Sequence, residues 1–395
     1  MKKLLFNNFE SFMESSIYDS SKNDKTTPHV KSIVMIYSNR YNSPPPLIPH
    51  LFVSNRSERI YNQIKLNKVN IIQYSVNQMA SEDDLLLVHT PIYLSKMNGK
   101  TISEIYEYPN LMTPFTQKYI DDNFISPIRW QIAGTCNAVE KALNNGASIN
   151  IGGGFIHPRR NKSLNRQLFS DIGIAIEKHC KNIKVLIINL DANQADGLYE
   201  YIQNKSNIYL FDMYNKNIIP AINKNNRIKL VTDIKKTTNI LHVPLDGGNL
   251  NHTFFGQNKF FNVKVNMLDP WNFTRKIHNR KICNHEYMRN LQKLPDFMDK
   301  IKPDIVIYHS GSDIYNEDPK GCMNVTKEGF IIRDLFVWQN CITRKIPICM
   351  IISEGFAPDI AEVIGESIEN ICNNYTNFIN NTNLESYNNR LQQLI

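Results

Sequence analysis

The feature that most constrains this chain is an apolar segment that ends in a loop carrying two carboxylates. Residues 185–190 (VLIINL) predict a buried strand, and residues 191–197 (DANQADG) are small and polar. In an open α/β sheet, ligands bind beyond the carboxyl ends of the strands. Asp191, Asn193 and Asp196 are therefore expected to converge on one site, although the pattern is also typical of a polar turn with an aspartate N-cap.

The same alternation of strands and helices runs through most of the chain. Further strands are predicted at 32–37, 148–155, 207–214, 303–313 and 347–356, and helices at 54–66, 129–144, 168–180, 284–301, 328–343 and 357–374. Several of these strands end in small polar loops. The pattern predicts a three-layer α/β/α domain with a mostly parallel sheet and helices on both faces.

One α/β domain, residues 31–376, accounts for this alternation. Residues 1–30 predict a polar N-terminal extension, and residues 377–395 predict a polar C-terminal tail. Residues 222–283 lack clear periodicity and predict an insertion with some β character. Residues 222–281 hold eleven Lys or Arg and three Asp, a difference of +8 that equals the net charge of the whole chain.

The distribution of cysteines, apolar runs and charge limits the class of protein. Seven scattered cysteines without CxxC spacing favour a reducing compartment. The N-terminal apolar run is too short for a signal peptide, and no run has the length of a membrane span. We therefore expect an intracellular protein, cytoplasmic or nuclear. The basic stretch 222–281 is more typical of a solvated face than of a nucleic-acid interface, although interleaved aromatic residues keep that alternative open.

Four ordered loops together resemble those of the histone deacetylase superfamily, which has the arginase-deacetylase fold. They are GGGFIHP (152–158), NLDANQADG (189–197), YHSGSD (308–313) and SEGF (353–356). The resemblance runs from about residue 33 to residue 370, apart from the basic insertion, and is closest to the class IV deacetylases. Four loops in the same order are far more specific than any single motif.

The resemblance implies a zinc hydrolase site whose metal ligands fall on three positions of this sequence. In the family, two aspartates and a histidine bind zinc and leave room for water and the acyl oxygen. The two aspartates fall on Asp191 and Asp313, and the histidine falls on Asn193. An amide is a poor zinc ligand compared with imidazole. The metal site is therefore expected to be degenerate.

The resemblance also implies a pair of histidines, each backed by an aspartate, that moves protons. The first pair falls on Ile156 and Asn189, so both of its members are lost. The second pair falls on His157 and Asp196, so both of its members remain. A buried aspartate without its histidine is costly, and a neutral asparagine is the expected companion of Ile156.

Three further family positions complete the comparison. The tyrosine that polarises the acyl carbonyl falls on Phe356, which has no hydroxyl. The glycine-rich wall of the acyl tunnel falls near residues 163–166, where SLNR stands. An aspartate in the helix behind the site falls on Asp171. His309, four residues before Asp313, is not expected to replace a ligand, because the loop at Gly311 should break the strand register.

These losses favour a catalytically defective deacetylase-like protein that acts as a binding or scaffold module for a protein partner, with no tightly bound cofactor. The first alternative is a zinc-dependent lysine deacetylase or deacylase with a weakened metal site, because His157 and Asp196 still offer a base. Asp191, Asp313 and the Asn193 oxygen also suit weak Mg²⁺ or Ca²⁺ binding. Another alternative is a nucleic-acid or acidic-partner binder that acts through the basic insertion. In a purely structural interpretation, His157 is a histidine of the core, and Asp191 and Asp313 cap turns.

Overall fold

The computed structural model of the chain describes residues 32–42, 55–105, 117–218, 239–248, 282–353, 355–382 and 385–394. The expected N-terminal extension and most of the basic insertion lie outside the described residues. No helix within the described ranges is long and apolar enough to cross a membrane.

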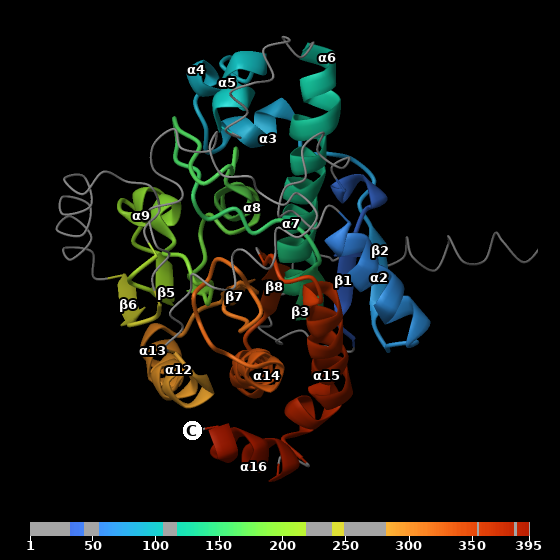
Figure 1. Cartoon of the computed structure of the whole chain (residues 1–395), viewed down its shortest axis with the longest axis vertical. Helices are drawn as coiled ribbons and strands as arrows, with labels where there is room; N and C mark the ends of the chain where they lie inside the picture. Colours follow the sequence, from blue (N-terminus) through green and yellow to red (C-terminus); the bar gives the residue numbers. More distant parts are fainter. Residues whose placement is uncertain are drawn as a thin grey trace, which may run out of the picture.

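An eight-stranded sheet runs through the centre of the described chain (Figure 1). Its strands are β1 (Val34–Tyr37), β2 (Ile72–Ser75), β3 (Ala147–Asn150), β4 (Val185–Asn189), β5 (Ile208–Asn215), β6 (Ile240–Leu245), β7 (Ile305–Ser310) and β8 (Ile348–Ile352). Their order across the sheet is β2-β1-β3-β8-β7-β4-β5-β6. Every pairing is parallel, so all carboxyl ends meet at one edge.

Helices cover both faces of the sheet (Figure 1). They are α2 (Arg56–Leu66), α3 (Glu82–Leu86), α4 (Pro91–Leu94), α5 (Gly99–Ile105), α6 (Gln117–Ile120), α7 (Ser126–Asn145), α8 (Asp171–His179), α9 (Asp196–Ile202), α12 (Asn284–Leu291), α13 (Leu294–Ile301), α14 (Lys327–Thr343), α15 (Ile360–Asn380) and α16 (Glu385–Leu394), with a 3-10 turn at Asn39–Tyr41 and a π turn at Asp121–Ile125. Leu186 and Ile188 of β4 enter one core, and Val185 and Ile187 enter the other. The predicted three-layer α/β/α fold is confirmed.

The structure corrects one predicted element and adds two strands. The helix expected at 284–301 is two helices, α12 and α13, because Pro295 lies in the first turn of α13 and proline suits a helix start but not an interior. The apolar pattern of the sequence does not predict strands β2 and β6, because both are edge strands, and β6 also contains Pro244. The segment 377–395 holds the end of α15 and the helix α16.

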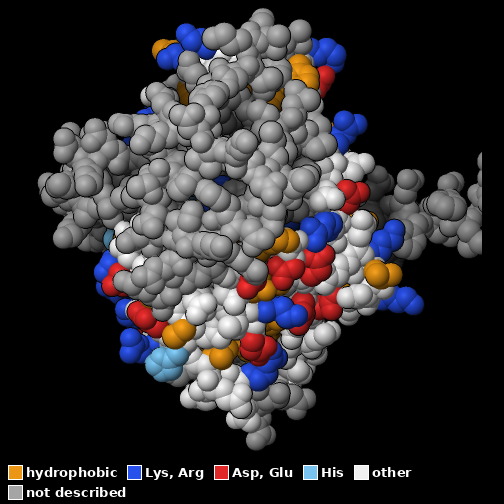
Figure 2. All heavy atoms as spheres, viewed as in Figure 1, with side chains coloured by type: hydrophobic (Ala, Val, Ile, Leu, Met, Phe, Trp, Pro, Cys, Tyr) orange, Lys and Arg blue, Asp and Glu red, His pale blue; other side chains and the backbone are white. Residues whose placement is uncertain are grey.

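The surface near α2 and α15 carries interspersed acidic and basic side chains (Figure 2). Arg59 of α2 lies 2.7 Å from Glu362 of α15. Lys327 of α14 lies 2.5 Å from Glu366 of α15. Such exposed pairs contribute little to stability individually, but they make this face one of mixed charge.

Candidate functional site

The loops that follow four neighbouring strands carry the predicted site residues. His157 follows β3, Asp191 follows β4, Asp313 follows β7 and Phe356 follows β8. In the sheet these strands are adjacent, in the order β3-β8-β7-β4. The parallel sheet thus brings segments that are far apart in the sequence to one edge, where ligands bind in open α/β sheets.

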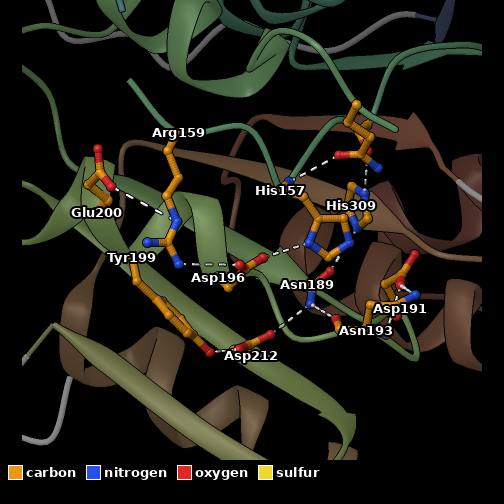
Figure 3. Close-up of polar contacts among 12 residues, drawn as sticks. His157, Arg159, Asn189, Asp191, Asn193, Asp196, Tyr199, Glu200, Asp212 and His309 are labelled. Carbon is orange, nitrogen blue, oxygen red and sulfur yellow. Dashed lines mark hydrogen bonds and ion pairs between the residues drawn. The ribbon is translucent and has the colours of Figure 1, made fainter. Parts of the chain in front are cut away.

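The side-chain amide of Asn193 contacts both predicted metal-binding carboxylates, and Figure 3 shows it beside Asp191. Its nitrogen donates to Asp191 Oδ1 at 2.9 Å and to Asp313 Oδ2 at 2.9 Å. The Asn193 backbone N–H donates to Asp191 Oδ1 at 2.8 Å, and the Ala192 N–H donates to Asp313 Oδ1 at 2.8 Å. Burial, together with the nearby Asp191, raises the pKa of Asp313 well above its usual range. An amide N–H group therefore takes the place between the carboxylates that a cation would otherwise fill.

This donor set does not fit the zinc of the family. A zinc site in such an enzyme takes three protein ligands drawn from histidine, cysteine and carboxylate. Among the described residues, no group of three or more His, Cys, Asp or Glu is placed to hold a metal ion. With its nitrogen turned toward Asp191 and Asp313, Asn193 presents donors where a metal needs acceptors.

The predicted His157–Asp196 pair is assembled as a buried contact. His157 Nδ1 lies 2.6 Å from Asp196 Oδ1, and both side chains are buried. The second oxygen of Asp196 lies 3.5 Å from Arg159 Nη2. The same guanidinium approaches Glu200, with 4.0 Å between Nε and Oε2. Asp196 is thus shared between an imidazole and an arginine that sequence reasoning did not single out.

The positions of the lost pair have different surroundings from those expected. Ile156 is buried in an apolar core. Asn189 bonds on two sides: its nitrogen donates to Asn193 O at 3.0 Å and to Asp212 Oδ1 at 2.6 Å, and its oxygen lies 2.7 Å from His309 Nδ1. Sequence reasoning missed both Asp212 and this role of His309. Their spacing along the sequence gives no sign of it, because the signal lies in the pairing register of three strands.

Asp171 binds the backbone of the glycine-rich loop at residues 152–155. Its carboxylate accepts the backbone N–H groups of Gly154 and Phe155, each at 2.8 Å, and the Thr135 hydroxyl at 2.6 Å. Gly153 and Gly154 have φ of 84° and 78°, which disfavours any other residue. A Cβ on Gly153 would also lie 2.4 Å from Asp171 Oδ2. Asp171 therefore fixes the loop that leads to His157.

Phe356 is buried and has a cationic neighbour. The Lys320 Nζ lies 3.7 Å from the centroid of its ring. Its backbone N–H donates to Asp318 Oδ2 at 2.6 Å. Burial raises the pKa of Asp318 to about 6, although three backbone N–H groups oppose the rise. In the 163–166 loop, Asn165 and Arg166 take left-handed conformations with φ of 49° and 62°.

Comparison with known proteins agrees with the fold. Residues 50–372 match the family described as the histone deacetylase domain. The chain belongs to the histone deacetylase domain family. It is 27% identical over 303 residues to histone deacetylase 2 of Arabidopsis thaliana, across 74% of this chain and 65% of that protein. It is 22% identical over 287 residues to an uncharacterized protein of Picosynechococcus sp., across 71% of this chain and 77% of that protein.

Proposed function

We propose that this member of the histone deacetylase family is a catalytically defective protein that serves as a binding or scaffold module. The observation that carries the proposal is the Asn193 amide, whose nitrogen bonds to Asp191 and Asp313 at 2.9 Å each. The family's chemistry depends on a metal that activates water and polarises the acyl oxygen. Here the amide N–H groups of Asn193 already bond to both carboxylates that such a metal would bind.

The remaining machinery supports the same conclusion. Phe356 has no hydroxyl for the developing oxyanion, and one such donor is worth roughly 10²–10³ in rate. Ile156 and Asn189 remove one proton-transferring pair, and general acid–base help is worth about 10²–10⁴. These contributions act as a unit, so the factors are not multiplied. Together they bring the expected turnover close to background.

One experiment tests the metal and the activity on the same purified protein. We expect elemental analysis after dialysis to find zinc well below one per chain, because a ligand is missing. We also expect no detectable hydrolysis of acetyl-lysine or fatty-acyl-lysine peptides. Asn193→His should raise zinc affinity, and the matched control Asn193→His with Asp313→Asn should lose it again. Stoichiometric zinc, or a wild-type rate within roughly tenfold of an intact deacetylase that Asp191→Ala abolishes, contradicts the proposal.

A lysine deacylase with a weakened metal site is the second candidate, and the buried His157–Asp196 contact at 2.6 Å favours it. Both groups needed for a general base are in hydrogen-bond reach. Arg159 weighs against this candidate, because a guanidinium 3.5 Å from Asp196 competes with the imidazole for the same carboxylate. The experiment above separates the two candidates.

The partner of the scaffold is a further part of the proposal. We propose an intracellular partner, either a protein or a polyanion that contacts the basic residues of 222–281. The seven cysteines of this protein are free thiols, and five of them are buried, which suits a reducing compartment.

A further inference from the structure

Three polar residues lie side by side across three adjacent strands beneath the site. In the sheet register, Asn189 of β4 pairs with Asp212 of β5 on one side and with His309 of β7 on the other. Register partners in a parallel sheet project to the same face. All three side chains are completely buried. We call His309, Asn189 and Asp212 the polar row.

Hydrogen bonds give the polar row a direction (Figure 3). The Asn189 nitrogen faces the Asn193 carbonyl at 3.0 Å, which only accepts, so the Asn189 oxygen must face His309 Nδ1 at 2.7 Å. Since that oxygen also only accepts, His309 Nδ1 is the donor in this contact. The other ring nitrogen, Nε2, lies 3.0 Å from the Gly154 carbonyl oxygen, so a neutral ring can donate to one of these two acceptors, and our inference places its proton on Nδ1. Asp212 takes the remaining Asn189 N–H at 2.6 Å and also accepts the Tyr199 hydroxyl.

We infer that the polar row takes the structural place of the histidine–aspartate pair that Ile156 and Asn189 do not form, and that it positions Asn193. Its imidazole and carboxylate come from β7 and β5, with the Asn189 amide between them. Through its nitrogen, Asn189 also holds the Asn193 carbonyl. The positioning claim rests on the proposed role of Asn193 as a substitute for the metal.

The polar row and a histidine–aspartate pair at positions 156 and 189 exclude each other. In the pair that the family resemblance implies, the imidazole at position 156 is backed by the side chain at position 189, whose oxygen here already lies 2.7 Å from His309 Nδ1. A carboxylate placed at residue 189 would face Asp212 across a contact of 2.6 Å. Two carboxylates at that distance cannot both ionise. Ile156→His with Asn189→Asp should therefore not form the histidine–aspartate pair on its own. A variant that forms the pair must also change His309 and Asp212.

A double-mutant cycle on thermal unfolding tests this exclusion. Ile156→His should lower the unfolding midpoint of the otherwise wild-type chain, by roughly 5 °C, because the buried imidazole finds no acceptor. His309→Leu should also lower it, because it leaves the Asn189 oxygen without a donor. In the His309→Leu background, Ile156→His should instead raise the midpoint, because the new imidazole gains that oxygen. The sign of its effect therefore depends on residue 309.

A matched control separates this coupling from the general cost of a buried imidazole. Ile176 of α8 lies in the same apolar core as Ile156, and Ile176→His should cost the same with or without His309. Equal costs of Ile156→His in both backgrounds overturn the inference. That result is distinct from failure of the proposed function, which zinc loading and peptide hydrolysis report.

A second measurement needs only the folded wild-type protein, in case His309→Leu does not fold. In a sample with ¹⁵N-labelled histidine, the His309 Nδ1 should carry a proton that exchanges slowly with solvent. The resonance is assigned by its loss in His309→Gln. Burial lowers the pKa of His309 and favours a neutral ring, so an unprotonated Nδ1, with the proton on Nε2 instead, overturns the inference.

Discussion

At the scale of single residues, Asp212 shows how burial changes the chemistry of a carboxyl group. Burial raises its pKa to about 7, and the hydrogen bonds from Tyr199 and Asn189 only partly oppose the rise. In the unfolded chain the pKa takes its ordinary value near 3.8. The folded state therefore binds the proton more tightly than the unfolded state over the interval between these values.

This difference predicts a pH dependence of stability. The contribution of Asp212 is fully present below about pH 4 and is lost as the pH rises toward about 7, by up to about 4 kcal/mol. Asp212→Asn should remove this part of the decline in the free energy of unfolding, measured by urea titration from pH 4 to 8. The surface control Asp299→Asn should leave the decline in place. An unchanged slope in Asp212→Asn would show that the group is ionised in the folded protein.

The individual site residues were predictable to different degrees. Asp191, Asp313, Asn193 and Asp171 stand in sequence motifs, so their positions could be read from the chain. The direction of the Asn193 amide could not, because it depends on two carboxylates more than a hundred residues apart. The contact of His309 depends on strand register, which the apolar pattern does not specify.

At the scale of elements, Gly134 lets α7 pack against Tyr41, in the turn that follows β1. Gly134 lies in this helix, and a Cβ there would come within 1.7 Å of Tyr41 Oη and 2.9 Å of Asn150 Oδ1. The Tyr41 hydroxyl donates to the same Asn150 oxygen at 2.9 Å. The glycine thus makes room for a buried hydrogen bond rather than for a turn.

Gly134→Ala should reverse the usual effect of this substitution. In a helix interior, alanine is normally more stable than glycine by about 0.5–1 kcal/mol. Here the overlap with Tyr41 should destabilise the protein by about 1–3 kcal/mol, measured by chemical unfolding. The control is Gly365→Ala in α15, where a Cβ meets only the flexible end of Gln63. A stabilising Gly134→Ala would mean that Tyr41 moves aside easily.

The apolar pattern of the sequence predicted the strongly periodic strands and helices, but it did not predict the edge strands. The central strands and the helices α2, α7, α8, α14 and α15 were predicted because each buries a regular apolar pattern. Edge strands β2 and β6 bury less and pair on one side only. The apolar pattern therefore does not predict β2 and gives only a general β character to the stretch that contains β6, and tertiary pairing decides their conformation.

At the scale of the whole molecule, the described residues that flank 249–281, the second half of the basic stretch, bond to neighbouring points of the domain. The Gly248 N–H donates to Cys322 O at 2.9 Å, and the Asn324 N–H donates to Ile282 O at 2.8 Å. The two described residues that flank 249–281, Gly248 and Ile282, therefore bond to Cys322 and Asn324, which are only two residues apart in the sequence. A short glycine–serine linker should join Gly248 to Ile282 without disturbing β6 or α12.

Replacing 249–281 by such a linker tests the proposed polyanion partner. The segment holds six Lys or Arg and one Asp, so its removal lowers the net charge by five. Wild-type affinity for DNA, RNA or heparin should fall steeply with salt, and the deletion should weaken it and flatten the salt slope. The matched control removes the same charge elsewhere by changing five lysines to glutamine: Lys65, Lys96, Lys100, Lys181 and Lys184. Equal affinity in wild type and deletion, or none in either, contradicts this partner.

The Asn193 amide also affects how the amount of folded protein in a cell depends on the metal concentration. A protein that binds a metal only when folded gains stability with the logarithm of the free metal concentration. On our proposal, the group between Asp191 and Asp313 belongs to the chain and is present at a fixed ratio in every molecule. The folded fraction then does not depend on the free metal concentration. Its abundance should stay constant through zinc starvation that depletes metal-dependent relatives.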